Sequence, residues 1–188
     1  MNKKLPILTI ALSLVISFLF MSAICKAQNY YLLIGTYTNQ GSKGIYVYNF
    51  NAKTGELTWI SNTDSSTNPS FLAISNNGRN VYAVNESAGK NPGKVSAYSF
   101  DKKKGVLSFI NSTFAGGDGP CYLAVSPDDN WLAVANYSAG STAIFPLNMD
   151  GSLDPFSQLI NDSIYNTSGK KVRPHVHATV FSPDGNYL

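Results

Sequence analysis

One sequence phrase occurs three times in this chain, and this repetition limits the possible folds more than any single residue does. The three copies are Asn68–Glu86, Gly119–Tyr137 and Arg173–Leu188. Each contains a short apolar run that ends in a serine followed by turn residues, and these serines are Ser75, Ser126 and Ser182. A period of roughly 50 residues built from short strands is typical of a β-propeller in which each repeat forms one four-stranded blade.

The apolar and alternating segments predict where the strands of each blade lie. The predicted strands of the two complete blades are 70–75, 79–86, 94–100 and 106–111, then 121–126, 131–137, 142–147 and 156–161. Three earlier strands, predicted at 30–36, 45–50 and 56–61, match the second, third and fourth strands of a blade. The fold class is therefore all-β, with about three blades where propellers have four to eight. We expect these residues to be part of a longer propeller.

The segment that precedes Gln28 has the features of a secretory signal peptide. Two lysines precede an apolar run from Leu5 to Met21, and Cys25-Lys26-Ala27 supplies the small residues of a cleavage site. An uncleaved membrane anchor is the alternative, because an apolar run of this length nearly spans a bilayer. The predicted domains are the signal peptide, 1–27, and an incomplete propeller domain, 28–188. We expect an exported protein, periplasmic or secreted, with no membrane attachment after cleavage.

The charge of the chain lies mainly in this leader. It holds three of the 14 basic residues and none of the 11 acidic ones, so residues 28–188 have no net formal charge. Nucleic-acid binding requires a clustered basic surface, and we predict no nucleic-acid partner. Cys121 is the one cysteine after the leader, which excludes a disulfide within residues 28–188. The segment 148–154 superficially resembles a calcium loop but lacks the closing Glu, and we predict a hairpin turn there.

Several motifs, in this order and spacing, resemble the lactonase family of seven-bladed β-propellers, which includes propeller-type 6-phosphogluconolactonases. They are Leu33-Ile-Gly-Thr-Tyr37, Gly44-Ile-Tyr-Val-Tyr48, Asn68-Pro-Ser70, Ala135-Asn-Tyr137 with Gly140, and Pro174-His-Val-His177 before Ser182-Pro-Asp-Gly185. The resemblance covers residues 29–188. It implies seven blades in the complete protein and hydrolysis of a sugar lactone, 6-phosphogluconolactone or a related aldonolactone, to the open acid. We expect no cofactor and no metal, and a monomer at full length.

Polar residues of all three copies are predicted to meet at one end of the central channel. The first strand of each blade lines the channel and the second runs antiparallel to it, so the start of one and the end of the other share a face. The predicted site residues on this face are Glu86, Asn136, Tyr137, Arg173, His175 and His177. When the copies are aligned on their serines, His177 occupies the position of Ser70 and Cys121. A ligand site is expected where such residues converge.

Each predicted site residue has a chemical role and a plainer alternative. His177 is the predicted base that activates water, Arg173 would bind the oxyanion or a phosphate, and Glu86 would orient the histidine or assist proton transfer. His175, Asn136 and Tyr137 are the predicted substrate-binding residues. The alternatives are structural histidines, a solvated Glu86, an exposed basic turn around Arg173, and packing roles for Asn136 and Tyr137. A zinc site at the His-x-His pair is disfavoured because further ligands are needed.

Two functions from different classes remain open. The first is an exported lactone hydrolase. The second is a non-catalytic exported propeller that binds a ligand or a protein partner through its channel face. Export conflicts with 6-phosphogluconolactone as the substrate, since that compound belongs to cytosolic metabolism, and an unphosphorylated aldonolactone removes the conflict.

Overall fold

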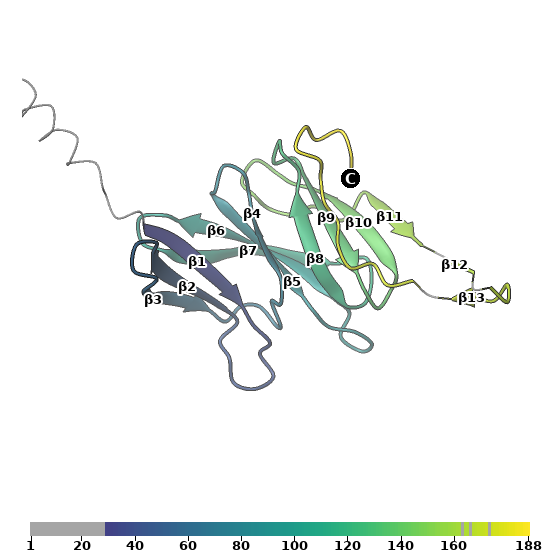
Figure 1. The fold of residues 1–188 in the computed structure, drawn as a ribbon, viewed down its shortest axis with the longest axis horizontal. Coiled ribbons are helices and arrows are strands. Elements are labelled where there is room, and N and C mark those ends of the chain that lie inside the picture. Colours follow the sequence, from purple (N-terminus) through teal and green to yellow (C-terminus); the bar gives the residue numbers. More distant parts are fainter. Residues whose placement is uncertain (1–28, 163, 166, 173) are drawn as a thin grey trace, which may run out of the picture.

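The computed structural model describes residues 29–162, 164–165, 167–172 and 174–188. The predicted signal peptide, 1–27, and Arg173 lie outside these residues. Within them all regular structure is β-strand, and three antiparallel sheets of three or four strands follow one another along the chain (Figure 1). The predicted all-β class is confirmed. None of the described residues belongs to a helix that could cross a lipid bilayer.

Each sheet corresponds to one blade, and the strands lie within each sheet in sequence order. The strands are β1 (Asn29–Gly35), β2 (Ile45–Asn51) and β3 (Leu57–Thr63), then β4 (Leu72–Ile74), β5 (Asn80–Asn85), β6 (Lys94–Asp101) and β7 (Val106–Phe114), then β8 (Pro120–Val125), β9 (Trp131–Asn136), β10 (Ser141–Pro146) and β11 (Gln158–Asn161). Their bounds agree closely with the predicted strands. The first sheet has three strands, as predicted, and β1 forms its open edge.

The serine turns are the same in all three copies, which explains why the phrase repeats. In each, the serine hydroxyl accepts the backbone N–H of the residue five positions later, at 2.9 Å from Asn80, 2.9 Å from Trp131 and 3.0 Å from Tyr187. It also donates to the Asn or Asp two positions later. The residue three positions after the serine has a positive φ in each copy, 65°, 59° and 72°. A short side chain therefore organises each tight turn.

The hairpin between the third and fourth strands also repeats. Gly55 and Gly105 have φ values of 76° and 67°, and each donates its N–H to the carbonyl four positions earlier. The β-bulges before Tyr48 and Tyr98 likewise occupy equivalent positions in the first two sheets. In the third blade the corresponding segment is a hairpin turn closed by the bridge between Leu147 and Leu153, so the predicted turn at 148–154 is confirmed.

The core lies between the sheets, and alternation along β5 assigns its side chains to two different neighbours. Val81 and Ala83 belong to the cluster shared with the first sheet, whereas Tyr82 and Val84 belong to the cluster shared with the third. The partners are Ile45 and Val47 on one side, and Leu123, Leu132, Val134, Ala143 and Phe145 on the other. The second blade therefore buries both faces, and the apolar run of β5 is nearly continuous.

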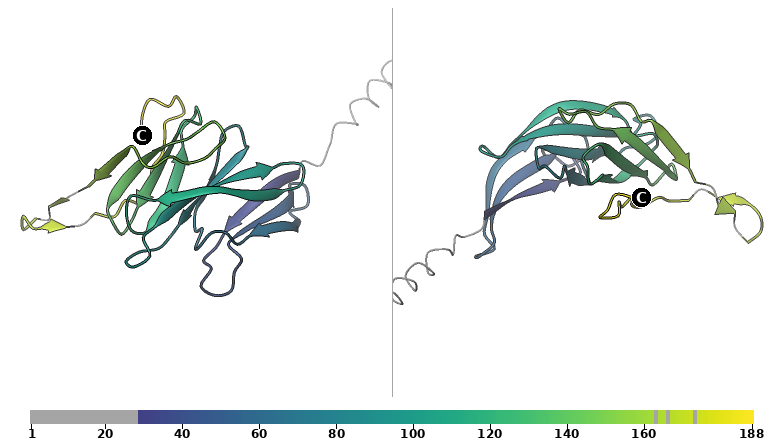
Figure 2. Two further views of the ribbon diagram at one scale, coloured as in Figure 1. Left: turned by 180° about the vertical axis from the view of Figure 1, so that it is seen from behind. Right: turned by 90° about the horizontal axis from the view of Figure 1, so that it is seen from above.

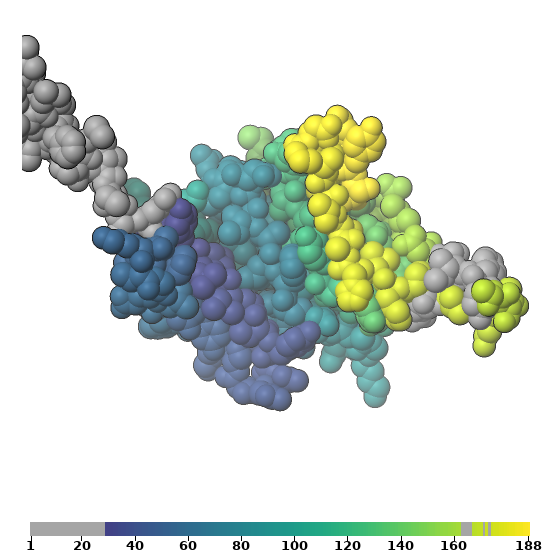
Figure 3. Space-filling view, viewed as in Figure 1, coloured from purple at the N-terminus to yellow at the C-terminus, as the bar shows by residue number. Residues whose placement is uncertain are grey.

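The sheets form an arc, and the third copy lies on its concave side. Figure 2 shows the arc from above, with residues 174–188 on the concave side, and Figure 3 shows these residues covering part of the third sheet. The contact is specific: the Thr179 hydroxyl, which is buried, donates to the carbonyl of Ala133 at 3.2 Å.

Residues 174–188, which carry the third copy of the phrase, contain no strand. In the other blades, the first strand is held by ladder bonds to the second strand, as between β8 and β9. In the third copy, Ser182 and Tyr187 make the hydrogen bonds of the serine turn, but no β-ladder extends from that turn within residues 174–188. A short hairpin that was not predicted, β12 (Ile164–Tyr165) with β13 (Lys171–Val172), precedes this segment.

Candidate functional site

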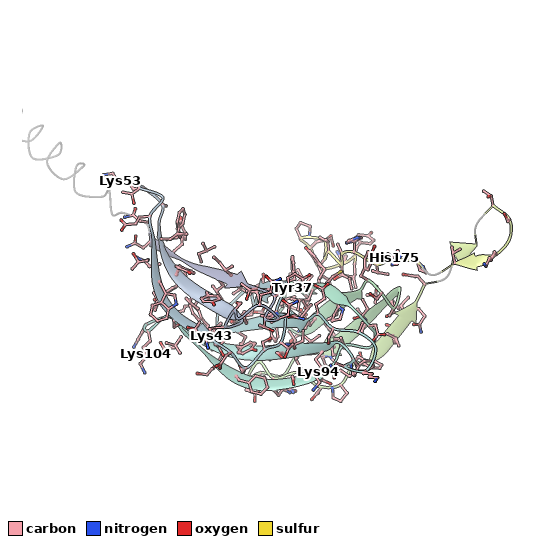
Figure 4. The ribbon with its side chains drawn as sticks, turned by 90° about the horizontal axis from the view of Figure 1, so that it is seen from below. Tyr37, Lys43, Lys53, Lys94, Lys104 and His175 are labelled. Carbon is pink, nitrogen blue, oxygen red and sulfur yellow. The ribbon has the colours of Figure 1, made fainter. Side chains whose placement is uncertain are left out.

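The repeat brings equivalent positions from successive blades to one end of the concave side. Tyr37, Glu86 and Tyr137 directly or closely follow the second strands β1, β5 and β9. Two of the labelled side chains of Figure 4, Tyr37 and His175, lie on the inner side of the arc, whereas Lys94 and Lys104 lie on its outer side. Tyr37 and His175 therefore lie on the side of the arc on which the channel mouth was predicted.

Glu86 is held by two hydroxyl groups. The Tyr37 hydroxyl donates a 2.8 Å hydrogen bond to Oε2 of Glu86, and the Ser70 hydroxyl donates a short hydrogen bond to the same oxygen. The hydrogen bond to Glu86 and partial burial raise the pKa of Tyr37, as does the Glu86 charge. Tyr37 comes from the first blade and Ser70 from the second, so the carboxylate joins two blades.

The backbone beside Glu86 is fixed as well. The Glu86 N–H donates to the carbonyl of Asn68 at 3.0 Å, and the Asn68 side-chain amide donates to the carbonyl of Glu86 at 3.1 Å. Asn68 has a φ of 45°, and Gly119, at the same place in the next copy, has a φ of 63°. Asn and Gly are the residues that tolerate this left-handed conformation best. The sharp turn at Asn68, before β4, thus fixes the direction in which the backbone leaves β5.

Cys121 connects the Glu86 region with the histidines. Burial raises the pKa of the Cys121 thiol, and the charge of Glu86 raises it further. Its sulfur lies 3.7 Å from the carbonyl oxygens of both Val176 and His177, within reach of a weak S–H hydrogen bond. The thiol is therefore a poor nucleophile in this setting, since the thiolate is the reactive form. Its position shows that His177 and Glu86 border the same region.

The ring of Tyr137 packs against the rings of both histidines. The His175 ring is stacked on it, with centroids 4.2 Å apart, and the His177 ring meets it edge-on at 4.6 Å. Both imidazoles are exposed and accessible to solvent. The arrangement presents two imidazole rings side by side on one tyrosine. Such a set can accept, donate and transfer protons.

The remaining predicted residues differ in their surroundings. Asn136 is fully buried, and its amide donates to the carbonyl of Ala115 at 2.9 Å and to the hydroxyl of Ser141 at 3.2 Å. Its counterpart Asn85 makes similar bonds to Ser66 and to the carbonyl of Thr67. This repeated network favours the packing role for Asn136, and substrate binding by Asn136 stays a prediction. Arg173 is not among the described residues.

Sequence reasoning did not assign a role to Tyr37 or Ser70. The signal was present in the repeat itself, because Tyr37 stands after its strand as Glu86 and Tyr137 do, and Ser70 aligns with His177.

A polar cavity of about 680 Å³ lies beside Asn68 and Asn85. Its walls are mostly hydroxyl and amide side chains, from Ser65, Thr67, Asn68, Asn85, Ser87, Asn91, Lys94, Ser96 and Ser112, with Pro92. Among the residues described, no three His, Cys, Asp or Glu side chains are grouped so that they could hold a metal ion.

The family model described as lactonase, 7-bladed β-propeller, matches residues 31–188. The chain belongs to this family. As a lactonase-family propeller it is 30% identical over 158 residues to the 6-phosphogluconolactonase of Bacillus subtilis and 33% identical over 161 residues to that of Formosa agariphila. These alignments cover 82% and 84% of this chain but 44% and 45% of the relatives.

A solved structure of a related protein also superposes on this lactonase-family chain. The periplasmic gluconolactonase of Pseudomonas aeruginosa superposes with a TM-score of 0.76 at 36% identity, covering 84% of this chain and 46% of that one. The chain therefore spans somewhat less than half the length of the proteins that it matches. The family membership confirms the predicted resemblance and the propeller fold.

Proposed function

We propose that this chain supplies part of the active site of a lactone hydrolase that opens a sugar lactone to its acid. The observation that carries the proposal is the convergence of Glu86, Tyr137, His175 and His177 at the channel mouth. Further support comes from the relatives, two of which are named 6-phosphogluconolactonases and one a periplasmic gluconolactonase. A lactonase needs a base for water and polar groups for the oxyanion, and this face offers both kinds of residue.

In the proposed mechanism His177 takes a proton from water as the water oxygen attacks the lactone carbonyl. The carbonyl oxygen becomes an oxyanion, which Arg173 stabilises with its guanidinium group. The ester C–O bond then breaks, and the ring oxygen leaves as a hydroxyl after it receives the proton from His177. Glu86 orients the substrate or the protonated imidazole. The balance is one water added and one ester bond broken, with no redox change.

Substrate binding is assigned to His175 and Tyr137, with Asn136 as a supporting residue. We propose an unphosphorylated aldonolactone or 6-phosphogluconolactone as the substrate. The predicted signal peptide and the periplasmic relative support export and favour the unphosphorylated compound. The complete protein is proposed to act as a monomer, without metal, in the periplasm or outside the cell.

The decisive experiment uses the complete product of the gene. Acid release from δ-gluconolactone and from its 6-phosphate is followed in a weakly buffered solution against the spontaneous rate, with and without a chelator. We expect enzyme-dependent hydrolysis that the chelator does not abolish. A rate equal to the spontaneous one for both lactones would overturn the proposal and favour a non-catalytic binding propeller. Loss of activity with the chelator, restored by zinc or calcium, would show a metal-dependent enzyme instead.

A further inference from the structure

The carboxylate of Glu86 is fixed asymmetrically. Both hydrogen bonds recorded to its side chain end on Oε2, one from the Tyr37 hydroxyl at 2.8 Å and one from the Ser70 hydroxyl. The two donors come from different blades, so they approach this oxygen from different directions. Two donors on one oxygen restrict rotation of the carboxylate and leave Oε1 as the oxygen that can accept a hydrogen bond from a ligand.

The surroundings of Glu86 indicate the chemistry of that ligand. An ionised carboxylate accepts hydrogen bonds and donates none, so it binds hydroxyl groups and repels anions such as phosphate. The neighbours that the structure records around Glu86 are Tyr37, Ser70, Asn68 and Cys121, all of which are uncharged at neutral pH. This setting matches a polyhydroxylated, uncharged part of a ligand.

We propose that Tyr37 and Ser70 are positioning residues that hold Glu86 so that its Oε1 accepts a hydrogen bond from a hydroxyl group of the sugar lactone. The identity of the ligand rests on the proposed function, whereas the positioning of Glu86 does not. Glu86 is then a specificity-determining residue that distinguishes a hydroxylated lactone from a plain one. A hydrogen bond to a charged group contributes strongly to recognition, which corresponds to about a 10- to 100-fold effect on binding.

The positioning is tested first, without reference to activity. Tyrosines labelled with 13C at the ζ carbon are titrated by NMR, and Tyr37→Phe identifies the Tyr37 signal. Because the Glu86 hydrogen bond and charge raise the pKa of Tyr37, Glu86→Gln should shift its titration to lower pH. Tyr46 is an internal control, since Ser42 and the Lys43 N–H lower its pKa and Glu86 does not contribute. A Tyr37 titration that is the same in both proteins overturns the positioning.

Hydroxyl recognition is tested with two lactones on the complete gene product. We expect Tyr37→Phe and Ser70→Ala to lower kcat/KM about 10- to 100-fold for δ-gluconolactone, mainly through KM, and to change δ-valerolactone hydrolysis less than about 3-fold. Glu86→Gln should lower kcat/KM for δ-gluconolactone at least as much. Tyr31→Phe is the matched control, because this tyrosine of β1 donates its own hydroxyl at 2.8 Å to the Lys102 carbonyl, in the hairpin between β6 and β7. Equal losses on both lactones would show that Glu86 acts in the chemistry and not in recognition.

A third measurement separates the two proposals from each other. D-glucono-δ-lactam, an uncharged analogue of the lactone whose amide resists hydrolysis, is added to the labelled protein at millimolar concentration, and the Tyr37 signal is followed. We expect a saturable shift in the wild type that is lost in Glu86→Gln. A protein that shows this shift but does not hydrolyse lactones would contradict the proposed catalysis and support hydroxyl recognition by Glu86. An active enzyme whose Tyr37 signal does not respond to the lactam would contradict hydroxyl recognition by Glu86 and leave the proposed catalysis standing.

Discussion

The imidazole of His175 lies nearly parallel to the phenol ring of Tyr137, with the ring centroids 4.2 Å apart and the planes at 13°. Nδ1 of His175 is also 3.1 Å from the carbonyl oxygen of Tyr137. The third copy of the repeat is thereby placed against the end of β9. His177, two positions later, meets the same ring edge-on, so one tyrosine sets the position of both histidines.

Replacing Tyr137 should therefore disturb both histidines at once. We expect Tyr137→Ala to lower kcat/KM for δ-gluconolactone about 3- to 10-fold, because a ring pair contributes about 0.5–1.5 kcal/mol beyond its buried area. Tyr137→Phe keeps the ring and should retain most of the activity. Initial rates of acid release measure both variants. If Tyr137→Phe loses as much as Tyr137→Ala, the hydroxyl and not the stacking is the important group.

Loss of the proposed base should have a larger effect than any other change on this face. We expect His177→Ala to lower kcat by about 10²- to 10⁴-fold, the usual contribution of general acid–base catalysis. His175→Ala serves as the comparison two positions away, and it should raise KM while kcat changes little. Steady-state kinetics of the complete gene product separate these effects. An unchanged kcat in His177→Ala would remove His177 from the mechanism.

The repeated serine turn allows a matched test of stability. Ser126 is buried, and its hydroxyl accepts the N–H of Trp131 at 2.9 Å, so Ser126→Ala leaves this donor without its partner. We expect the free energy of unfolding to fall by about 1–3 kcal/mol. Ser75→Ala removes the equivalent bond to the N–H of Asn80, also at 2.9 Å and at an equally buried turn, and should cost about as much. Urea unfolding of the complete gene product measures both, and a cost below about 0.5 kcal/mol for either would contradict the role of the serine in the turn.

Close packing at Gly140 should control how the histidine segment docks. A Cβ at Gly140 would lie 2.5 Å from the carbonyl oxygen of Pro174, just before His175. Gly140 has a φ of 65°, and Gly89, with a φ of 72°, has open space around it. Both Ala substitutions therefore carry the left-handed cost of about 1–2 kcal/mol, but only Gly140→Ala should also displace the segment. Hydrogen exchange of residues 174–182 measures the displacement, and equal protection in both variants would refute the contact.

The outer face of the first sheet should make residues 28–188, expressed alone, self-associate and remain inactive. Leu32, Tyr48 and Trp59 are cross-strand neighbours on this face, with Leu32 37% and Trp59 56% exposed. In a closed ring a neighbouring blade would cover such a face, and uncovered apolar patches associate. We expect Leu32→Lys with Trp59→Lys to reduce the association seen by analytical ultracentrifugation, unlike Met149→Lys at an isolated exposed site. A monodisperse, active wild-type fragment would contradict this prediction.

The repeat, the strands and the turns were predictable because their causes are local. The serine turn at Ser126 closes on Trp131, a near neighbour in the chain, and the alternation of Tyr82 and Val84 with Val81 and Ala83 follows from the geometry of one strand. Such features depend on nearby residues of the chain and recur wherever the phrase recurs. Their agreement between copies is why the predicted blades match the observed ones.

Contacts between repeats depend on how the sheets pack. The hydroxyl of Tyr37 reaches Glu86 across 49 residues, the thiol of Cys121 reaches the His177 carbonyl across 56, and His175 reaches Tyr137 across 38. Each contact requires a particular angle and spacing between one sheet and the next. Packing of that kind is set by the whole buried interface and not by a motif. The local patterns of the chain therefore specify which residues stand at the channel mouth, and the packing of the blades specifies which of them touch.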